Sequence, residues 1–240
     1  MWFVLRACQH TEPEPTRVCL RFIRVTPVEA ELATAESIKE RYPLLVSLRK
    51  SLEGLPEHEG LIHMFRGMEA ERLMLQAASV APRSKARAVM LDEYLKALDA
   101  YDSKSLTIPL VVMNNLAWHL SEDQDPDRKA RSLQLGERLK QLVPDPRIAP
   151  DAHDTYAWVL HRNERHSEAE TILRDLLKVA DQPIYRYHLA SVLFAQKKFD
   201  EALKEVQVAR DSPRPFTESG AARDLEYEIR EARRKAIGEQ

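Results

Sequence analysis

Two pairs of histidines come closest to a metal-binding pattern in this sequence. His58-Glu-Gly-Leu-Ile-His63 is similar to the H-E-x-x-H zinc motif, in which the spacing places both histidines on one face of a helix. Here one extra residue separates the histidines, and Gly60 lies between them. His161 and His166 flank a predicted turn with no cysteine nearby. We therefore expect solvated histidines and no metal site.

The sequence lacks the short motifs of nucleophilic catalysis and phosphate binding. No Gly-x-Ser-x-Gly segment occurs, and the 6 glycines never cluster into a phosphate-binding loop. Cys8 and Cys19 lie in the least regular part of the chain; we interpret them as reduced thiols, with a disulfide as the alternative. Glu168 and Glu201 are expected near helix starts, where they favour the helix dipole. We therefore expect no catalytic residues, no cofactor and no enzymatic activity.

Tryptophan and asparagine residues in predicted helices are the best candidates for binding. Trp118 and Trp158 each directly follow an alanine that is expected to pack against a neighbouring helix, so each indole lies about 100° round its helix from that contact. Exposed tryptophans recur in binding hot spots. The alternative is that both rings pack between neighbouring units. Asn114 and Asn115 indicate hydrogen bonds either to a bound peptide backbone or between helices, because asparagine is a modest helix former.

Composition favours a helical protein and argues against a general nucleic-acid binder. The 240 residues include 36 Lys and Arg and 38 Asp and Glu, a net charge of −2, whereas nucleic-acid binders normally have a basic excess. The basic stretches 83–87 and 230–235 stand beside acidic residues and are interpreted as solvated faces. Few glycines and only 7% aromatic residues are typical of a mostly helical chain.

No segment approaches the roughly 20 apolar residues of a membrane span. Residues 1–5 are apolar but are followed by Arg6, which is short of the roughly 7–15 apolar residues of a secretory signal. We therefore predict a cytoplasmic protein without a membrane span. An export signal outside this chain is the alternative.

Prolines divide the chain into segments with helical periodicity. Residues 1–28 fit no helix, and 17–25 is predicted to be a short strand or an extended lead-in. Single helices are expected at about 29–52, 60–80 and 84–101, the last with Val89, Met90, Tyr94 and Ala97 on one face. Helix pairs then follow at 109–120 with 126–142, 151–162 with 167–179, and 183–196 with 200–210, before a final helix at about 217–237.

The starts of the second helices carry residues typical of helix caps. Asp125-Pro126 is predicted to be an N-cap followed by a first-turn proline. Ser167 and Asp200 are also of capping residue types, and each is followed by Glu-Ala.

The segments 151–177 and 184–210 match each other at an offset of 33 residues. The matched positions include Ala157 with Ala190, Leu160 with Leu193, and Ala169 with Ala202. A unit this short cannot bury its own apolar stripe, so it must stack on a neighbour.

These units resemble the tetratricopeptide repeat family, in a bacterial type. The family's first helix carries W-x2-L-G-x2-Y, and its second carries A-x3-F before a closing proline. The matching segments are Tyr156-Ala157-x2-Leu160, Leu189-Ala190-x2-Leu193, Ala169-x3-Leu173 and Ala202-x3-Val206, with a third copy beginning at Asn115-Leu-Ala-x2-Leu120. Glu164 and Lys197 stand where the turn between the helices commonly has glycine.

The resemblance implies an all-α fold, a right-handed α-α superhelix of tetratricopeptide-like helix-turn-helix repeats with a C-terminal capping helix. We divide the chain into an irregular or extended segment 1–28, a degenerate helical region 29–106 and a repeat region 107–237. The repeats are 107–143, 151–180 and 183–211, and the capping helix is 217–237.

In such a stack the first helix of each pair lines a concave groove, which implies a non-catalytic scaffold or adaptor that binds a protein or peptide segment. The residues expected to line this groove are Asn114, Asn115, Trp118, Asp154, Thr155, Trp158, His161, Arg162, Tyr187, His188 and Phe194. One alternative is a regulatory or accessory subunit of an enzyme or of an envelope or exopolysaccharide system. A helical-repeat RNA binder is the other, and the net charge disfavours it. Nothing in the sequence indicates an oligomeric state.

Overall fold

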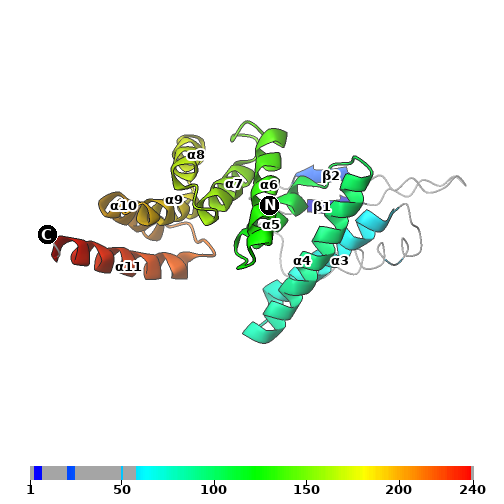
Figure 1. The fold of residues 1–240 in the computed structure, drawn as a ribbon, viewed down its shortest axis with the longest axis horizontal. Coiled ribbons are helices and arrows are strands. Elements are labelled where there is room, and N and C mark those ends of the chain that lie inside the picture. Colours follow the sequence, from blue (N-terminus) through cyan, green and yellow to red (C-terminus); the bar gives the residue numbers. More distant parts are fainter. Residues whose placement is uncertain (1–2, 7–20, 25–49, 51–57, 239–240) are drawn as a thin grey trace, which may run out of the picture. The chain divides into compact units, whose positions relative to one another are not determined.

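The structure is a computed structural model that describes residues 3–6, 21–24, 50 and 58–238. The chain divides into two units, Met1–Lys104 and Ser105–Gln240, which are described separately below (Figure 1). The helix predicted at about 29–52 lies outside the described residues, apart from residue 50.

The first unit contains a two-stranded antiparallel pair. Strand β1 (Phe3–Arg6) pairs with β2 (Arg21–Arg24), so that Phe3 lies opposite Arg24 and Arg6 opposite Arg21. The strand alternative for residues 17–25 therefore holds for the four residues of β2. The rest of the described secondary structure is helical, and the chain is all-α in character apart from this short pair.

Helices α3 (Glu59–Gln76) and α4 (Val80–Ser103) pack along each other in the first unit. Gly67 allows this close approach, because a Cβ atom there would lie 2.3 Å from Cδ1 of Tyr94. The Tyr94 hydroxyl donates a hydrogen bond of 2.6 Å to Glu71 Oε2. Met90, Tyr94 and Ala97 are buried as predicted. Val89 is 47% exposed, contrary to the prediction, because it lies about 100° round the helix from Met90.

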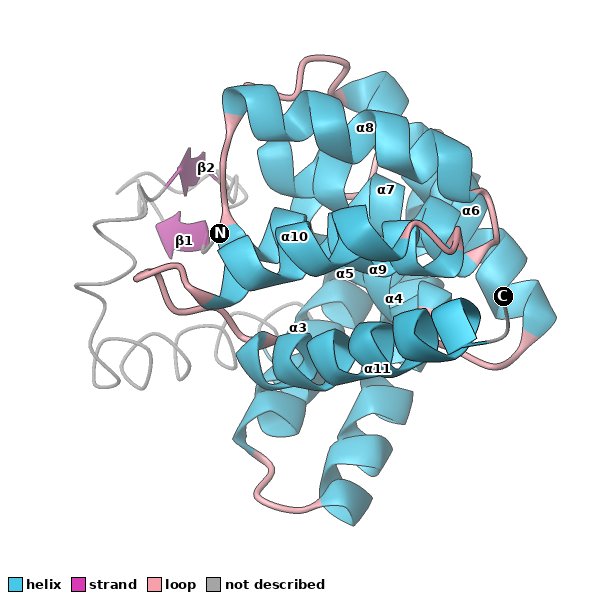
Figure 2. Cartoon of the chain, turned by 90° about the vertical axis from the view of Figure 1, so that its left-hand side faces the viewer, coloured by secondary structure: helices cyan, strands magenta, loops and turns pink. Residues whose placement is uncertain are grey.

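The second unit consists of three helix pairs and a final helix (Figures 1 and 2). The pairs are α5 (Leu110–Ser121) with α6 (Pro126–Leu142), α7 (Pro150–Arg162) with α8 (His166–Val179), and α9 (Pro183–Ala195) with α10 (Phe199–Arg210). The first helices also contact one another in order, α5 with α7 and α7 with α9. Helix α11 (Ser219–Gly238) packs against α10 and α9. None of the described helices combines the length and apolar character needed to cross a membrane.

The predicted cap at Asp125 is confirmed, but those at the next two second helices are not. The Asp125 side chain accepts a hydrogen bond of 2.9 Å from the backbone N–H of Asp127, and Pro126 is the first residue of α6. Helices α8 and α10 begin one residue earlier than predicted, at His166 and Phe199. Ser167 and Asp200 therefore lie in the first turn of each helix and cap neither.

The turns after α7 and α9 have the same backbone geometry. Glu164 and Lys197 adopt left-handed conformations with φ of 63° and 61°. After α7, the N–H groups of Glu164 and Arg165 donate to the carbonyls of His161 and Leu160; after α9, those of residues 197 and 198 donate to the carbonyls of residues 194 and 193. This left-handed C-terminal motif normally uses glycine. The offset of 33 residues thus relates equivalent turns as well as equivalent side chains.

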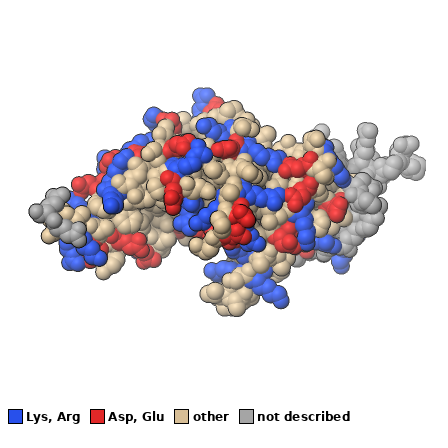
Figure 3. Space-filling model, in the orientation of Figure 1, with Lys and Arg blue, Asp and Glu red and all other residues tan. Residues whose placement is uncertain are grey.

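The matched small and apolar positions form the core of the second unit. Ala117, Ala157 and Ala190, one on each first helix, have no exposed surface, and neither do Leu160 and Leu193. The core cluster continues through α8 and α10 into α11. Lys and Arg are interspersed with Asp and Glu over the face shown in Figure 3.

Candidate partner-binding face

Four aromatic rings form a continuous row across the second unit. Trp118 on α5 lies 5.3 Å from Trp158 on α7, measured between ring centroids, and Trp158 lies 6.4 Å from Tyr187 on α9. Tyr187 in turn lies 6.3 Å from Phe216, in the segment before α11. We call these four residues the aromatic strip. Three of them are half-buried, and Trp158 is 8% exposed.

His188 packs against three members of this strip. Its ring centroid lies 4.4 Å from that of Trp158, 5.3 Å from that of Trp118 and 5.4 Å from that of Tyr187. The side chain is 1% exposed, and its Nδ1 lies 2.8 Å from Oδ1 of Asp154 on α7. Its other ring nitrogen, Nε2, is buried without a hydrogen-bond partner.

Asp154 is buried together with His188 and links α7 to α9. Burial raises the pKa of the Asp154 carboxyl, although the nearby His188 ring opposes that shift. A second link between the same helices is the hydrogen bond of 2.6 Å that the Tyr185 hydroxyl donates to Asp151 Oδ1. Polar pairs therefore join successive first helices in addition to the apolar core.

Glu122, at the end of α5, anchors the strip and was not among the predicted residues. The indole N–H of Trp158 donates a hydrogen bond of 2.7 Å to Glu122 Oε1. Arg162 Nε lies 3.2 Å from the same oxygen, an ion pair without hydrogen-bond geometry. A sequence signal for Glu122 existed, because it lies one helical turn after Trp118 and so shares its face.

His161 and His166 contact each other, and His161 also lies beside Trp158. Their Nδ1 atoms are 3.1 Å apart, and the His161 ring lies 5.1 Å from that of Trp158. Burial lowers the pKa of His161 to about 3, with smaller contributions from His166 and Arg162. His161 is therefore neutral at neutral pH. Both rings are half-buried, so the expectation of solvated histidines is wrong in this respect.

Within the described part of the chain, no group of three or more His, Cys, Asp or Glu side chains is arranged to hold a metal ion.

The remaining predicted residues occupy different environments. Asn114 and Asn115 are half-buried on α5, and Asn114 Oδ1 is buried without a hydrogen-bond partner. Thr155 is buried on α7. Phe194 does not join the strip; its ring lies 6.0 Å from that of Phe199 across the turn between α9 and α10.

Both interpretations of the two tryptophans describe part of what is observed. The rings stack on each other between neighbouring pairs, as the packing interpretation expects. Trp118 nevertheless keeps part of its surface exposed, whereas Trp158 is buried. A partner can therefore reach Trp118 more easily than Trp158.

Three acidic side chains lie near Tyr187 of the strip. Burial raises the pKa of the Tyr187 hydroxyl, and the carboxylates of Glu218, Glu122 and Glu228 raise it further. A hydrogen bond with Ser191 opposes this shift. The three carboxylates come from the C-cap of α5, the residues before α11, and α11 itself.

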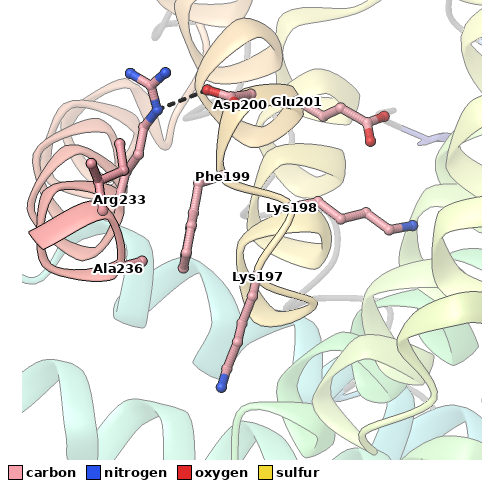
Figure 4. A pocket seen from close by; sticks show the side chains of 8 residues that line it. Lys197, Lys198, Phe199, Asp200, Glu201, Arg233 and Ala236 are labelled. Carbon is pink, nitrogen blue, oxygen red and sulfur yellow. Dashed lines mark ion pairs between the residues drawn. The ribbon is translucent and has the colours of Figure 1, made fainter. Parts of the chain in front are cut away.

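A pocket of about 350 Å³ lies elsewhere in the second unit, between the start of α10 and the end of α11 (Figure 4). Phe199, Ala236 and Ile237 supply its apolar lining, and Arg233 Nε lies 2.7 Å from Asp200 Oδ1 at its edge. None of the residues predicted to line the concave groove lines this pocket.

Comparisons of the chain with protein-family models, with curated proteins and with solved structures found no match.

Proposed function

We propose that residues 105–238 form a right-handed superhelix of tetratricopeptide-like repeats that binds a segment of a partner protein and performs no catalysis. The binding surface is the face formed by the first helices α5, α7 and α9. The aromatic strip carries this proposal, because it gathers rings from all three first helices and from the segment before α11. Large, rigid aromatic side chains are the residues that most often dominate binding energy.

The repeat geometry supports a surface that is formed before the partner arrives. Equivalent left-handed turns end α7 and α9, and the pair of Asp154 and His188 joins these two helices. A face held in this way loses little conformational entropy when it binds a partner, which favours affinity.

A protein partner is better supported than a nucleic acid. Basic and acidic residues are interspersed over the visible surface in Figure 3, and the net charge of the chain is −2. A nucleic-acid interface normally requires a continuous basic patch.

Peptide display tests the proposal directly. Peptides are selected from a random library on the wild-type protein, and their affinities are measured by fluorescence anisotropy for the wild type and for Trp118→Ala. We expect the substitution to weaken binding by about tenfold or more, the loss of a hot-spot aromatic side chain. Tyr227→Ala is the matched control, because Tyr227 is an aromatic residue on α11 that is 67% exposed and lies outside the strip.

Peptides that bind Trp118→Ala as tightly as the wild type would contradict the proposed face. A selection that yields no ligand at all would contradict the binding function itself.

A further inference from the structure

We infer that the aromatic strip receives an arginine side chain from a basic segment of the partner protein. This inference rests on the proposed function and adds the chemistry of the partner to it. It depends on two observations at the same face: unpaired carboxylates and a half-buried aromatic surface that a partner can reach.

The charge at this face is an excess of carboxylate. Glu122, Glu218 and Glu228 all lie close enough to the Tyr187 hydroxyl to act on it electrostatically. Glu218 and Glu228 have no ion-pair partner within the described residues. Arg162, which lies at this face, is already paired with Glu122. The face therefore attracts a cationic segment and repels an acidic one.

Arginine is the side chain that fits both observations. Its guanidinium group is always charged, and its N–H donors match the geometry of a carboxylate. Its planar surface stacks on indole and phenol rings, to which a cation is also attracted. Trp118 and Tyr187 offer such surfaces: both rings are half-buried, and both pack against the buried ring of His188.

Three synthetic fluorescent peptides test this inference on the full chain. They share a Gly-Ser backbone and carry arginine, lysine or citrulline at the same positions; citrulline keeps the shape of arginine but has no charge. We expect the arginine peptide to bind about tenfold more tightly than the citrulline peptide and more tightly than the lysine peptide. Added salt should weaken its binding.

The double variant Glu218→Gln with Glu228→Gln should reduce the affinity for the arginine peptide several-fold and leave the citrulline peptide unaffected. Glu231→Gln is the matched control, because this α11 carboxylate is already paired with Arg234 at 2.6 Å. Equal binding of the arginine and citrulline peptides, or no effect of the double variant, would overturn the inference. Equal binding of the arginine and lysine peptides would show that charge alone is recognised and would overturn the inferred stacking of a guanidinium group.

A failure of the arginine inference can be distinguished from a failure of the proposed function. If displayed peptides bind through Trp118 but are not enriched in arginine, the binding face stands and the inference of a basic partner is wrong. If no displayed peptide depends on Trp118, the binding face itself is wrong.

Discussion

The indole of Trp118 lies nearly parallel to the indole of Trp158, with centroids 5.3 Å apart and planes inclined by 18°. One ring belongs to the first helix of one pair and the other to the first helix of the next pair. Both follow an alanine that packs in the core. The two indoles therefore occupy equivalent positions in successive helix pairs, and their stacking joins one pair to the next.

The two tryptophans should contribute differently to stability. Trp158 is buried and hydrogen-bonded to Glu122, so Trp158→Ala should lower the free energy of unfolding by about 3–5 kcal/mol. Trp118→Ala should cost less, because Trp118 is only half-buried. Urea denaturation followed by circular dichroism measures both. Equal losses for the two variants would show that the indoles are buried to the same degree.

The buried pair of Asp154 and His188 should depend on hydrogen bonding more than on charge. Asp154→Ala leaves His188 Nδ1 without an acceptor and should cost about 1–3 kcal/mol. Asp154→Asn keeps an acceptor oxygen and removes a buried charge, so its stability at neutral pH should be close to that of the wild type. An Asn variant as unstable as the Ala variant would contradict this account.

The same pair predicts the sign of a pH dependence. Burial raises the pKa of Asp154 above its ordinary value of 3.8, so the folded protein binds this proton more tightly than the unfolded chain. The stability contributed by the protonated form is therefore lost as the pH rises above 3.8. Asp154→Asn should remove this contribution, which thermal melts over a pH series can measure.

His161 should change the pH dependence of stability in the direction opposite to that of Asp154. Its pKa falls from the ordinary 6.5 to about 3, so the unfolded chain binds a proton that the folded protein does not. His161 therefore favours folding above pH 6.5, and this contribution is lost as the pH falls through the window from 6.5 to 3. His161→Phe should show a smaller loss of melting temperature over this window than the wild type. An unchanged pH profile would mean that His161 is readily protonated in the folded protein.

The left-handed turns predict stabilising substitutions. Glu164 and Lys197 adopt positive φ, which disfavours any residue with a Cβ atom. Glu164→Gly and Lys197→Gly should each raise the free energy of unfolding by up to about 1 kcal/mol. Glu164→Ala is the control, since it removes the same side chain but keeps the Cβ atom, and it should not stabilise. Destabilisation by both glycine variants would contradict the assigned turn geometry.

Gly67 should be intolerant of substitution. An alanine Cβ atom there would lie 2.3 Å from Cδ1 of the buried Tyr94, whose hydroxyl is held by Glu71. Gly67→Ala should therefore destabilise the first unit by about 1–3 kcal/mol, although alanine is the better helix former. At Gly220 in α11 a Cβ atom would meet nothing within 4 Å, so Gly220→Ala should be neutral or stabilising. Chemical denaturation of the two variants distinguishes these outcomes.

Much of the helical arrangement from residue 109 onward could be predicted from the sequence. Pro126 and Pro183 mark first turns, and the apolar periodicity between prolines places helix ends within a residue or two of those observed. Glu164 and Lys197 were expected at the position that favours glycine, and their positive φ explains why this position is special. Both signals are local, so they can be read from neighbouring residues.

Other features depend on how distant residues meet. His188 was expected in an open groove, but it is buried because side chains from α5 and α7 cover it. Phe216 lies outside the repeats, so no periodicity indicated that it extends the aromatic strip. The pairing of β1 with β2 likewise depends on two segments well separated in sequence.

Hydrogen–deuterium exchange with a display-selected peptide is the measurement that tests partner binding by the first helices most directly. The account predicts that bound peptide slows exchange in α5, α7 and α9, and that Trp118→Ala abolishes this protection. Protection confined to α6, α8 and α10, or protection that persists in Trp118→Ala, would contradict it.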